Sequence, residues 1–201
     1  MDVRTFFLMQ YDVVRILADE LVLAEINDDQ LLHASGEDQR SLAWLLWHTT
    51  RWEDVAMTMV EHDAPQVLYQ KGWSTHLGIA RCDIGVMMTA QEHSTFNDTV
   101  NLPAVRAYRR DVEQRTQMVL ETLLSEGLDE LVQETRFRQV LEAGIIGSIN
   151  TSWLERFLMH RSRAWWLSSV IWHQAAHLLG EAPWLRRRAG VLLSMTSIDK
   201  S

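Results

Sequence analysis

Three histidines in two distant segments could together bind a divalent metal ion. His173 and His177 are four residues apart, in the sequence Trp-His173-Gln-Ala-Ala-His177. On a helix, residues four apart lie on one face, one turn apart, so both imidazoles could reach a single ion. His48 lies far earlier, in Leu-Leu-Trp-His48-Thr-Thr-Arg. Zinc and similar ions accept three protein nitrogens and leave one position open for water or substrate. If His48 meets the later pair, the chain has an open, reactive metal site.

Such a site favours one of two reactions. It can lower the pKa of a bound water to near neutrality, which favours hydrolysis, or deprotonate a bound thiol, which favours thiol transfer to an electrophile. We expect one divalent ion, zinc in the first instance and nickel as the alternative. The ligands bind as neutral imidazoles, so affinity for the metal should fall below about pH 6. Nearby polar groups should orient the rings. The candidates by proximity in sequence are Gln174, Glu53, Asp54 and Glu181.

Tryptophan is abundant around both histidine segments. The chain has nine tryptophans, and Trp73 lies apart from the rest. The other eight are Trp44, Trp47, Trp52, Trp153, Trp165, Trp166, Trp172 and Trp184. They could fill the core, or they could line a pocket for an apolar ligand. The pocket candidates are Trp44, Trp52, Trp166 and Gln174. The second reading favours a non-enzymatic binding module as the alternative function.

The remaining histidines and the single cysteine lack a comparable setting. We expect His76 and His93 to lie on the surface of a long connection, although that connection could approach the site. The other histidines are His33, His62 and His160. Cys82 is the only cysteine, so no disulfide can form within the chain, which fits a reducing compartment. It is expected in a loop as an unreactive thiol.

Composition indicates one soluble, cytoplasmic domain over residues 1–201 that acts on a small molecule. The formal net charge of −8 argues against general nucleic-acid binding, which needs a basic face. The one basic run, residues 186–188, is expected to be a solvated helix end. No apolar run approaches the roughly 20 residues that span a bilayer, and no signal peptide is recognisable, so no membrane partner is expected.

Apolar periodicity predicts four long helices, over residues 4–26, 41–62, 102–124 and 162–181. In the second, Ser41 is the expected N-cap, and His48 lies on the apolar arc that faces the interior. The charged residues Arg51, Asp54 and Glu61 lie toward the opposite side of that helix. In the first helix the expected buried stripe is Phe6, Val13, Leu17, Leu21 and Ala24. The third helix has a mostly solvated face with Arg106, Arg109, Arg110, Asp111, Glu113 and Arg115.

The last long helix is apolar almost all round, which predicts that it is fully buried. Residues 63–100 are too long for a bare loop and predict a crossover between parallel helices, which could cover a site. A capping-box pattern, Thr89 with Glu92, predicts a short helix over 90–96. Further short helices are expected over 128–134, 136–143 and 152–160, and Pro183 should end or kink the final helix before a last turn.

Three segments together resemble the DinB/YfiT-like superfamily of metal-dependent enzymes. They are Leu-Trp-His48-Thr-Thr-Arg-Trp-Glu-Asp, Leu-Pro103-Ala-Val-Arg-Ala-Tyr108 and Trp-His173-Gln-Ala-Ala-His177-Leu-Leu-Gly-Glu181. The resemblance implies an all-α four-helix bundle with a long crossover, and a divalent metal held by His48, His173 and His177. It also implies a homodimer. Some members resemble S-transferases or isomerases that use a small thiol such as bacillithiol, mycothiol or glutathione. Residues 125–165 carry no matching motif.

Overall fold

Four long helices dominate the structure, a computed structural model that describes residues 1–34, 36–61, 64–122, 127–145 and 152–191. These ranges contain helices and no strand, which confirms the all-α prediction. The long helices are α1 (Val3–Ala18), α3 (Leu42–Val60), α6 (Leu102–Glu121) and α9 (Arg163–Gly180). None of the described helices combines the length and apolarity that crossing a bilayer requires.

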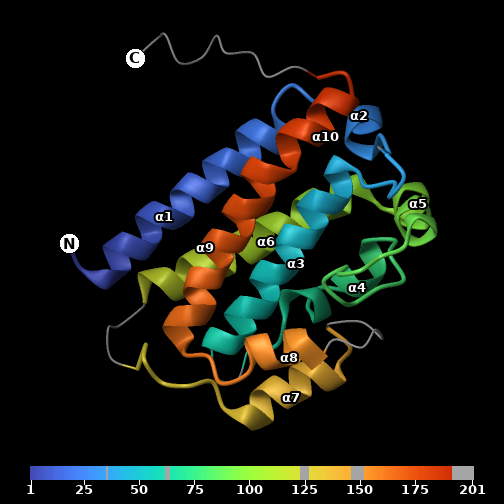
Figure 1. The fold of residues 1–201 in the computed structure, drawn as a ribbon. Coiled ribbons are helices and arrows are strands. Elements are labelled where there is room, and N and C mark those ends of the chain that lie inside the picture. Colours follow the sequence, from blue (N-terminus) through green and yellow to red (C-terminus); the bar gives the residue numbers. More distant parts are fainter. Residues whose placement is uncertain (35, 62–63, 123–126, 146–151, 192–201) are drawn as a thin grey trace.

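The four long helices form a closed bundle in which each contacts two neighbours. α3 packs against α6 and α9, and α1 packs against the same two helices from the other side. In Figure 1, α1 and α9 run in one general direction, and α3 and α6 run in the other. The parallel pair α3 and α6 therefore needs the long crossover that the sequence predicts. The crossover contains η2 (Val67–Tyr69), α4 (Trp73–His76) and α5 (Ala90–Thr99).

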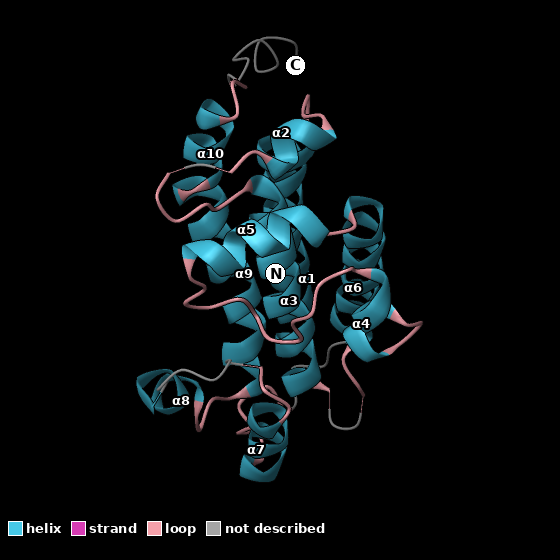
Figure 2. Ribbon diagram, turned by 90° about the vertical axis from the view of Figure 1, so that its right-hand side faces the viewer, coloured by secondary structure: helices cyan, strands magenta, loops and turns pink. Residues whose placement is uncertain are grey.

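The crossover covers one face of α3. Figure 2 views this side, with α5 lying across α3 and the short helices α7 (Glu134–Glu142) and α8 (Ser152–Leu158) at the lower end. The remaining short helices are α2 (Asp28–Leu32) and α10 (Ala182–Arg188). Because the crossover closes over α3, that helix is buried on every side.

Several helix starts follow the predicted capping chemistry. The Ser41 hydroxyl accepts a hydrogen bond from the backbone N–H of Trp44 at 3.1 Å, so α3 begins where the sequence places it. Thr89 and Glu92 form the predicted capping box of α5. Pro183 lies in the first turn of α10, directly after α9 ends at Gly180. The two caps satisfy backbone N–H groups that have no partner inside their helix, and Pro183 suits a first turn because it has no backbone N–H.

Two predicted helices are wrong in extent. The helix expected over 4–26 ends as an α-helix at Ala18 and continues only as one π-helical turn, Asp19–Leu23. No helix forms over 128–134. There the backbone carbonyl oxygens of Leu128 and Glu130 accept hydrogen bonds from the start of α9. Residues 127–130 instead form a turn and a bend, whose carbonyl groups pair with α9.

The predicted buried faces of the first and last long helices also need correction. The core takes Phe7, Tyr11, Val14 and Ala18 from α1, whereas the predicted Phe6 and Val13 are 44% and 51% exposed. Tyr11 selects this face, because its hydroxyl donates to buried Glu53 at 2.5 Å. On α9, Trp172 and Leu179 are exposed. α9 is therefore only partly buried, although its sequence is apolar almost all round. The long helix that is buried on every side is α3.

Arginines expected in solvent are buried and donate to acceptors inside the protein. Arg51 is wholly buried and donates to Asp54 at 3.0 Å, to Tyr108 at 2.8 Å and to the backbone of Cys82 at 2.8 Å. Arg186, predicted on a solvated helix end, is only 2% exposed and donates to backbone carbonyls after α1. Arg109 and Arg115 of α6 are likewise buried. A buried guanidinium is tolerated when acceptors surround it, and apolar periodicity alone cannot show those acceptors.

Candidate metal centre and cavity

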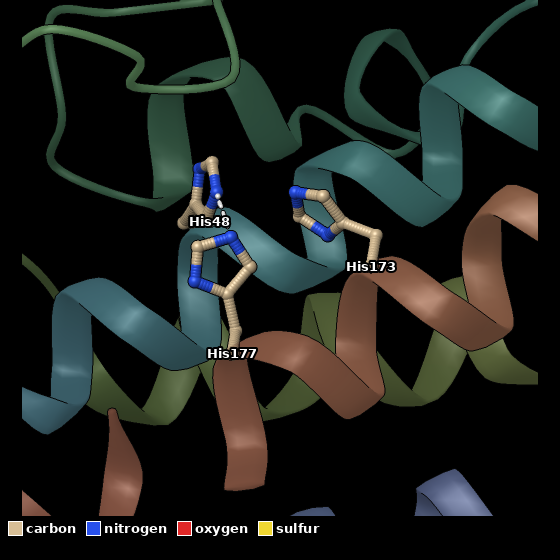
Figure 3. Close-up of side chains that lie close together, drawn as sticks. All are labelled: His48, His173 and His177. Atoms are coloured by element: carbon tan, nitrogen blue, oxygen red, sulfur yellow. Dashed lines mark hydrogen bonds between the residues drawn. The ribbon is translucent and has the colours of Figure 1, made fainter. Parts of the chain in front are cut away.

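The three histidines of the predicted metal site meet between two helices. His48 comes from α3, and His173 and His177 come from successive turns of α9. Figure 3 shows the three rings pointing toward one another. One ligand atom from each residue lies within 4.8 Å of the other two. The Nε2 atoms of His48 and His177 are 3.3 Å apart.

The separation of these nitrogens fits a shared ion. Two nitrogens bound at about 2.0–2.1 Å with a tetrahedral angle would lie about 3.3 Å apart. The His48 and His177 pair already has that spacing. Contraction of the cluster, which spans at most 4.8 Å, would bring His173 to the same ion. Three neutral imidazoles form a donor set that zinc and nickel accept.

The outer ring nitrogens of two histidines are held by the protein. Nδ1 of His48 hydrogen-bonds the backbone carbonyl of Ile84 in the crossover. Nδ1 of His177 donates to Oε1 of Glu181 at 2.8 Å. With their protons fixed at Nδ1, both rings present the Nε2 lone pair to the cluster. His173 Nδ1 is buried and has no partner among the described residues.

Tryptophans flank two of the histidines and keep them dry. Trp44 stacks on His48 with ring centres 4.8 Å apart, and Trp52 stacks on His173 at 4.7 Å. Burial, assisted by the neighbouring His177, lowers the pKa of His48 from 6.5 to about 4. Burial and the other two histidines also lower the pKa of His173 well below 6.5. Both rings are therefore neutral at neutral pH, which is the form that binds metals.

A short chain of charged groups extends from His177. Glu181 accepts from His177, and its other oxygen accepts from Arg40 at 2.7 Å. Arg40 also donates to Asp38 at 2.5 Å. Burial raises the pKa of Glu181, but the hydrogen bond from His177 and the charges of His177, Arg40 and His48 together outweigh burial, so the pKa is lowered overall. Glu181 is thus an anion that holds the His177 ring in place.

Of the four residues considered for orienting the rings, only Glu181 bonds one. Glu53 accepts from Tyr11, from Thr116 at 2.6 Å and from Gln174 at 2.5 Å, so it ties α1, α6 and α9 to α3. Asp54 bonds Arg51 and the backbone of η2. These side chains build the scaffold around the site. The partner of His48 is the backbone carbonyl of Ile84, which side-chain types in the sequence cannot identify.

A cavity of about 460 Å³ opens onto the three histidines. Its walls come from α3, the crossover, α8 and α9. Besides the histidine cluster, the described lining residues are Asp38, Arg40, Trp44, Trp52, Ile84, Gly85, Val86, Met87, Met88, His93, Trp153, Leu154, Phe157 and Glu181. Trp44 and Trp52 thus lie where the sequence suggested. Trp166 lies in the core beside Trp52, with ring centres 5.9 Å apart, and Gln174 points to Glu53.

His93 differs from its expected place on the surface. It lies on the inner face of α5, is 3% exposed and lines the cavity. Its ring packs edge-on against Trp44, with centres 5.0 Å apart. His93 and Phe96 lie three residues apart on one face of a helix with a clear capping box, a spacing that could have indicated burial. His76 is exposed on α4, and His62 lies outside the described residues.

Comparison with known proteins agrees with this geometry. The chain belongs to the DinB superfamily, whose sequence pattern it matches over residues 10–179. The crystal structure of a conserved protein from Enterococcus faecalis has the same fold, with a TM-score of 0.68 and 19% sequence identity. The match covers 94% of this chain and 98% of that chain. No curated protein matches. Family and histidine cluster together fit a metal-binding protein.

Proposed function

We propose that this protein is a divalent-metal-dependent enzyme that activates a low-molecular-weight thiol, or water, for attack on an electrophile. The ion would be held by His48, His173 and His177. One observation carries the proposal: two Nε2 atoms lie 3.3 Å apart, both with their outer nitrogens already bonded, at the floor of a cavity. Structural metal sites are closed, whereas three protein ligands beside a cavity leave a position for a reactant.

A bound divalent ion would lower the pKa of a thiol or water held beside it. The protein's own groups prepare that position. The carbonyl of Ile84 and the carboxylate of Glu181 keep protons at Nδ1, so both Nε2 atoms remain available. The stacked rings of Trp44 and Trp52 exclude water from one side of the cluster. Glu181, which also bonds Arg40, balances part of the positive charge.

Thiol transfer is the form of the reaction that we favour. In it the thiolate sulfur forms a bond to carbon of the electrophile, the leaving group departs with its electron pair, and the thiol proton passes to solvent. A cavity of about 460 Å³ with mostly apolar walls suits a small thiol together with an organic electrophile. Members that the sequence resembles use small thiols, which supports the same choice. Hydrolysis is the alternative outcome of the same site.

Metal analysis of protein purified without a histidine tag tests the site. We expect about one zinc or nickel ion per chain, as a three-histidine site implies. His48→Ala and His177→Ala should lose the ion. His76→Ala is the matched control, because His76 is exposed and outside the cluster. A wild-type protein that stays empty after zinc and nickel are added would refute the proposal.

An activity assay tests the reaction class. Zinc-loaded protein should accelerate the loss of glutathione or cysteine thiol in the presence of 1-chloro-2,4-dinitrobenzene, and His177→Ala should abolish the acceleration. Rates for the two thiols would rank the cosubstrates. If the loaded protein instead hydrolyses an activated ester such as 4-nitrophenyl acetate and leaves thiols unchanged, water is the nucleophile and the hydrolase alternative holds.

We also propose that the protein acts as a homodimer in the cytoplasm. An exposed apolar stripe on α1 supports the dimer: Phe6, Met9, Val13 and Ile16 are between 44% and 61% exposed. Their spacing of three, four and three residues places them on one helix face, as in helix pairing. The single free cysteine supports a reducing compartment. Sedimentation velocity over a range of protein concentrations measures the oligomeric state.

A further inference from the structure

The charged groups at the cavity wall are already paired with one another. Arg40 is the only lysine or arginine among the described lining residues, and both Asp38 and Glu181 accept hydrogen bonds from it. Glu181 also holds His177. In metal-free protein an anionic ligand would therefore find no free cation among the described wall residues and would have to approach two carboxylates. This arrangement favours an uncharged ligand.

The uncharged walls are largely aromatic. Trp44, Trp52, Trp153 and Phe157 contribute rings, and Ile84, Met87 and Met88 contribute apolar side chains. Trp153 and Phe157 come from α8, across the cavity from the tryptophans of α3. Rings gain most from contact with other rings, and methionine adapts to the outline of a flat ligand. The wall chemistry therefore matches an aromatic body.

His93 is a polar group at this wall that nothing in the protein uses. Its ring is 3% exposed, yet Nδ1 has no hydrogen-bond partner among the described residues. Buried polar nitrogens are nearly always bonded. Nδ1 is enclosed by the protein, whereas Nε2 is not enclosed and forms no hydrogen bond among the described residues, so Nε2 marks the place for a ligand atom in the cavity that His93 lines. Burial lowers the pKa of His93, so the neutral ring can donate or accept.

The other unbonded nitrogen at the wall outside the histidine cluster is differently placed. Nε1 of Trp44 also lacks a partner, but Gly85 packs over it. A Cβ atom added to Gly85 would lie only 3.1 Å from this nitrogen. The backbone of the crossover thus covers Trp44 Nε1. His93 remains the polar side chain that a ligand can reach away from the three histidines.

We propose that the cavity binds an uncharged aromatic molecule with one hydrogen-bonding group, and that His93 holds this group. The proposal rests on the proposed function in taking this molecule as the electrophilic substrate. His93 is a binding and specificity residue in this role. It touches Trp44, which stacks on His48, so a ligand held by His93 extends along the indole toward the metal position. The binding itself requires no metal.

Equilibrium dialysis with three naphthalene probes tests the proposal. 2-Naphthol carries one hydroxyl, 2-methylnaphthalene replaces it by a methyl group, and 2-naphthoate carries a negative charge. Chelator-treated wild-type protein should bind 2-naphthol at least tenfold more tightly than 2-naphthoate. His93→Leu should weaken 2-naphthol binding about five- to tenfold, the usual effect of losing one hydrogen bond, and change 2-methylnaphthalene binding by less than about twofold.

His93→Gln is the conservative variant and should recover part of the affinity for 2-naphthol, because its amide can donate and accept. Circular dichroism of both variants checks that α5 still folds. An equal loss for 2-naphthol and 2-methylnaphthalene in His93→Leu would assign His93 to packing alone and overturn the proposal. Tight binding of 2-naphthoate to chelator-treated protein would overturn the predicted preference for uncharged molecules.

Measurements on chelator-treated and zinc-loaded protein separate this proposal from the proposed function. A His93-dependent preference for 2-naphthol in both forms supports the inference, whether or not zinc binds. If zinc binds at the histidine cluster and the probes show no dependence on His93, the metal site stands and the inference fails. If the preference persists in protein that cannot bind zinc or nickel, the cavity belongs to a binding module and the proposed enzyme fails.

Discussion

At the scale of single residues, the site depends on where the imidazole protons lie. The Ile84 carbonyl and Glu181 accept from Nδ1 of His48 and His177, which leaves two Nε2 lone pairs 3.3 Å apart. Without an ion, these lone pairs face each other in a dry environment. The neutral form of His48 persists because protonation would place a charge in a site that excludes water. The metal-free site is therefore sensitive to acid.

The first prediction concerns this acid sensitivity. The pKa of His48 falls from 6.5 in the unfolded chain to about 4 in the fold, because of burial and the nearby His177. As the pH falls through about 6.5, His48 binds a proton in the unfolded chain, whereas in the folded chain it binds one only near pH 4. The free energy of unfolding of metal-free protein should therefore decrease across this window, by up to about 3 kcal/mol from His48.

Urea unfolding of chelator-treated protein at a series of pH values measures this loss. His48→Gln is the matched variant, because glutamine does not titrate. Its free energy of unfolding should fall less than that of the wild type between pH 6.5 and about 4, while carboxylates titrate in both proteins. Parallel curves for the two proteins would show that His48 is not a buried neutral group.

The second prediction concerns Glu181. Glu181→Ala removes the acceptor of His177 Nδ1 and should weaken zinc binding about tenfold to a hundredfold. Glu181→Gln keeps an acceptor oxygen and should weaken it less. Asp38→Ala is the control, because it breaks a contact of Arg40 but leaves the bond between His177 and Glu181. Competition with a fluorescent zinc chelator gives the affinities, and wild-type affinity in Glu181→Ala would exclude this role.

Residue type and spacing, together with the resemblance to the DinB/YfiT-like superfamily, predicted the histidine cluster but not its surroundings. His173 and His177 share a helix face by their spacing alone, and His48 lies on an apolar arc. The Ile84 carbonyl carries no signature in the sequence, because every residue has one. His93 depends on how α5 docks on Trp44, which is a tertiary contact. Local patterns contain no information about such contacts.

At the scale of elements, capping chemistry predicted helix starts better than apolar periodicity predicted faces. Ser41 and Thr89 cap their helices as expected because a cap is a local hydrogen bond. On α1 two apolar stripes compete, and the buried one is chosen by Tyr11, which bonds Glu53 of α3. The turn at residues 127–130 likewise pairs with the start of α9. Both outcomes depend on residues distant in sequence.

The third prediction concerns the crossover, which closes over α3 at Gly85. This residue has φ of +74°, and an added Cβ would lie 2.5 Å from the Trp47 ring. Gly85→Ala should therefore combine backbone strain with a clash and lower the free energy of unfolding by about 2–4 kcal/mol. It should also weaken zinc binding, because the displaced Trp44 supports His48.

Gly190→Ala is the matched control for Gly85→Ala. Gly190 has φ of +76°, but an added Cβ there would meet no atom within 4 Å. Gly190→Ala should therefore lower the free energy of unfolding only through backbone strain, by roughly 1–2 kcal/mol, and should leave zinc binding unchanged. Urea unfolding compares the two variants with the wild type. Equal losses of stability in the two variants would mean that the crossover can shift away from α3 to accommodate the added Cβ without further loss of folding free energy.

At the scale of the whole molecule, the site lies where the bundle and its crossover meet. The DinB-like arrangement that the sequence predicted is confirmed, and it explains why the parallel helices α3 and α6 need a long connection. That connection supplies the Ile84 carbonyl and His93, so the cavity wall on this side is a consequence of topology. Opposite the crossover, α1 has two apolar stripes, and the described residues bury only one of them.

The last prediction assigns the unused stripe of α1 to a second copy of the chain. A charge introduced there would be buried in the dimer without a partner, so Val13→Glu should shift the protein from dimer to monomer in sedimentation velocity at micromolar concentrations. Tyr69→Glu is the control, since Tyr69 is similarly exposed, at 48%, but lies on the crossover. Zinc content should stay the same in both variants, because the three histidines lie within one chain. A wild-type protein that sediments as a monomer at all concentrations, or a Val13→Glu protein that remains dimeric, would exclude α1 as the interface.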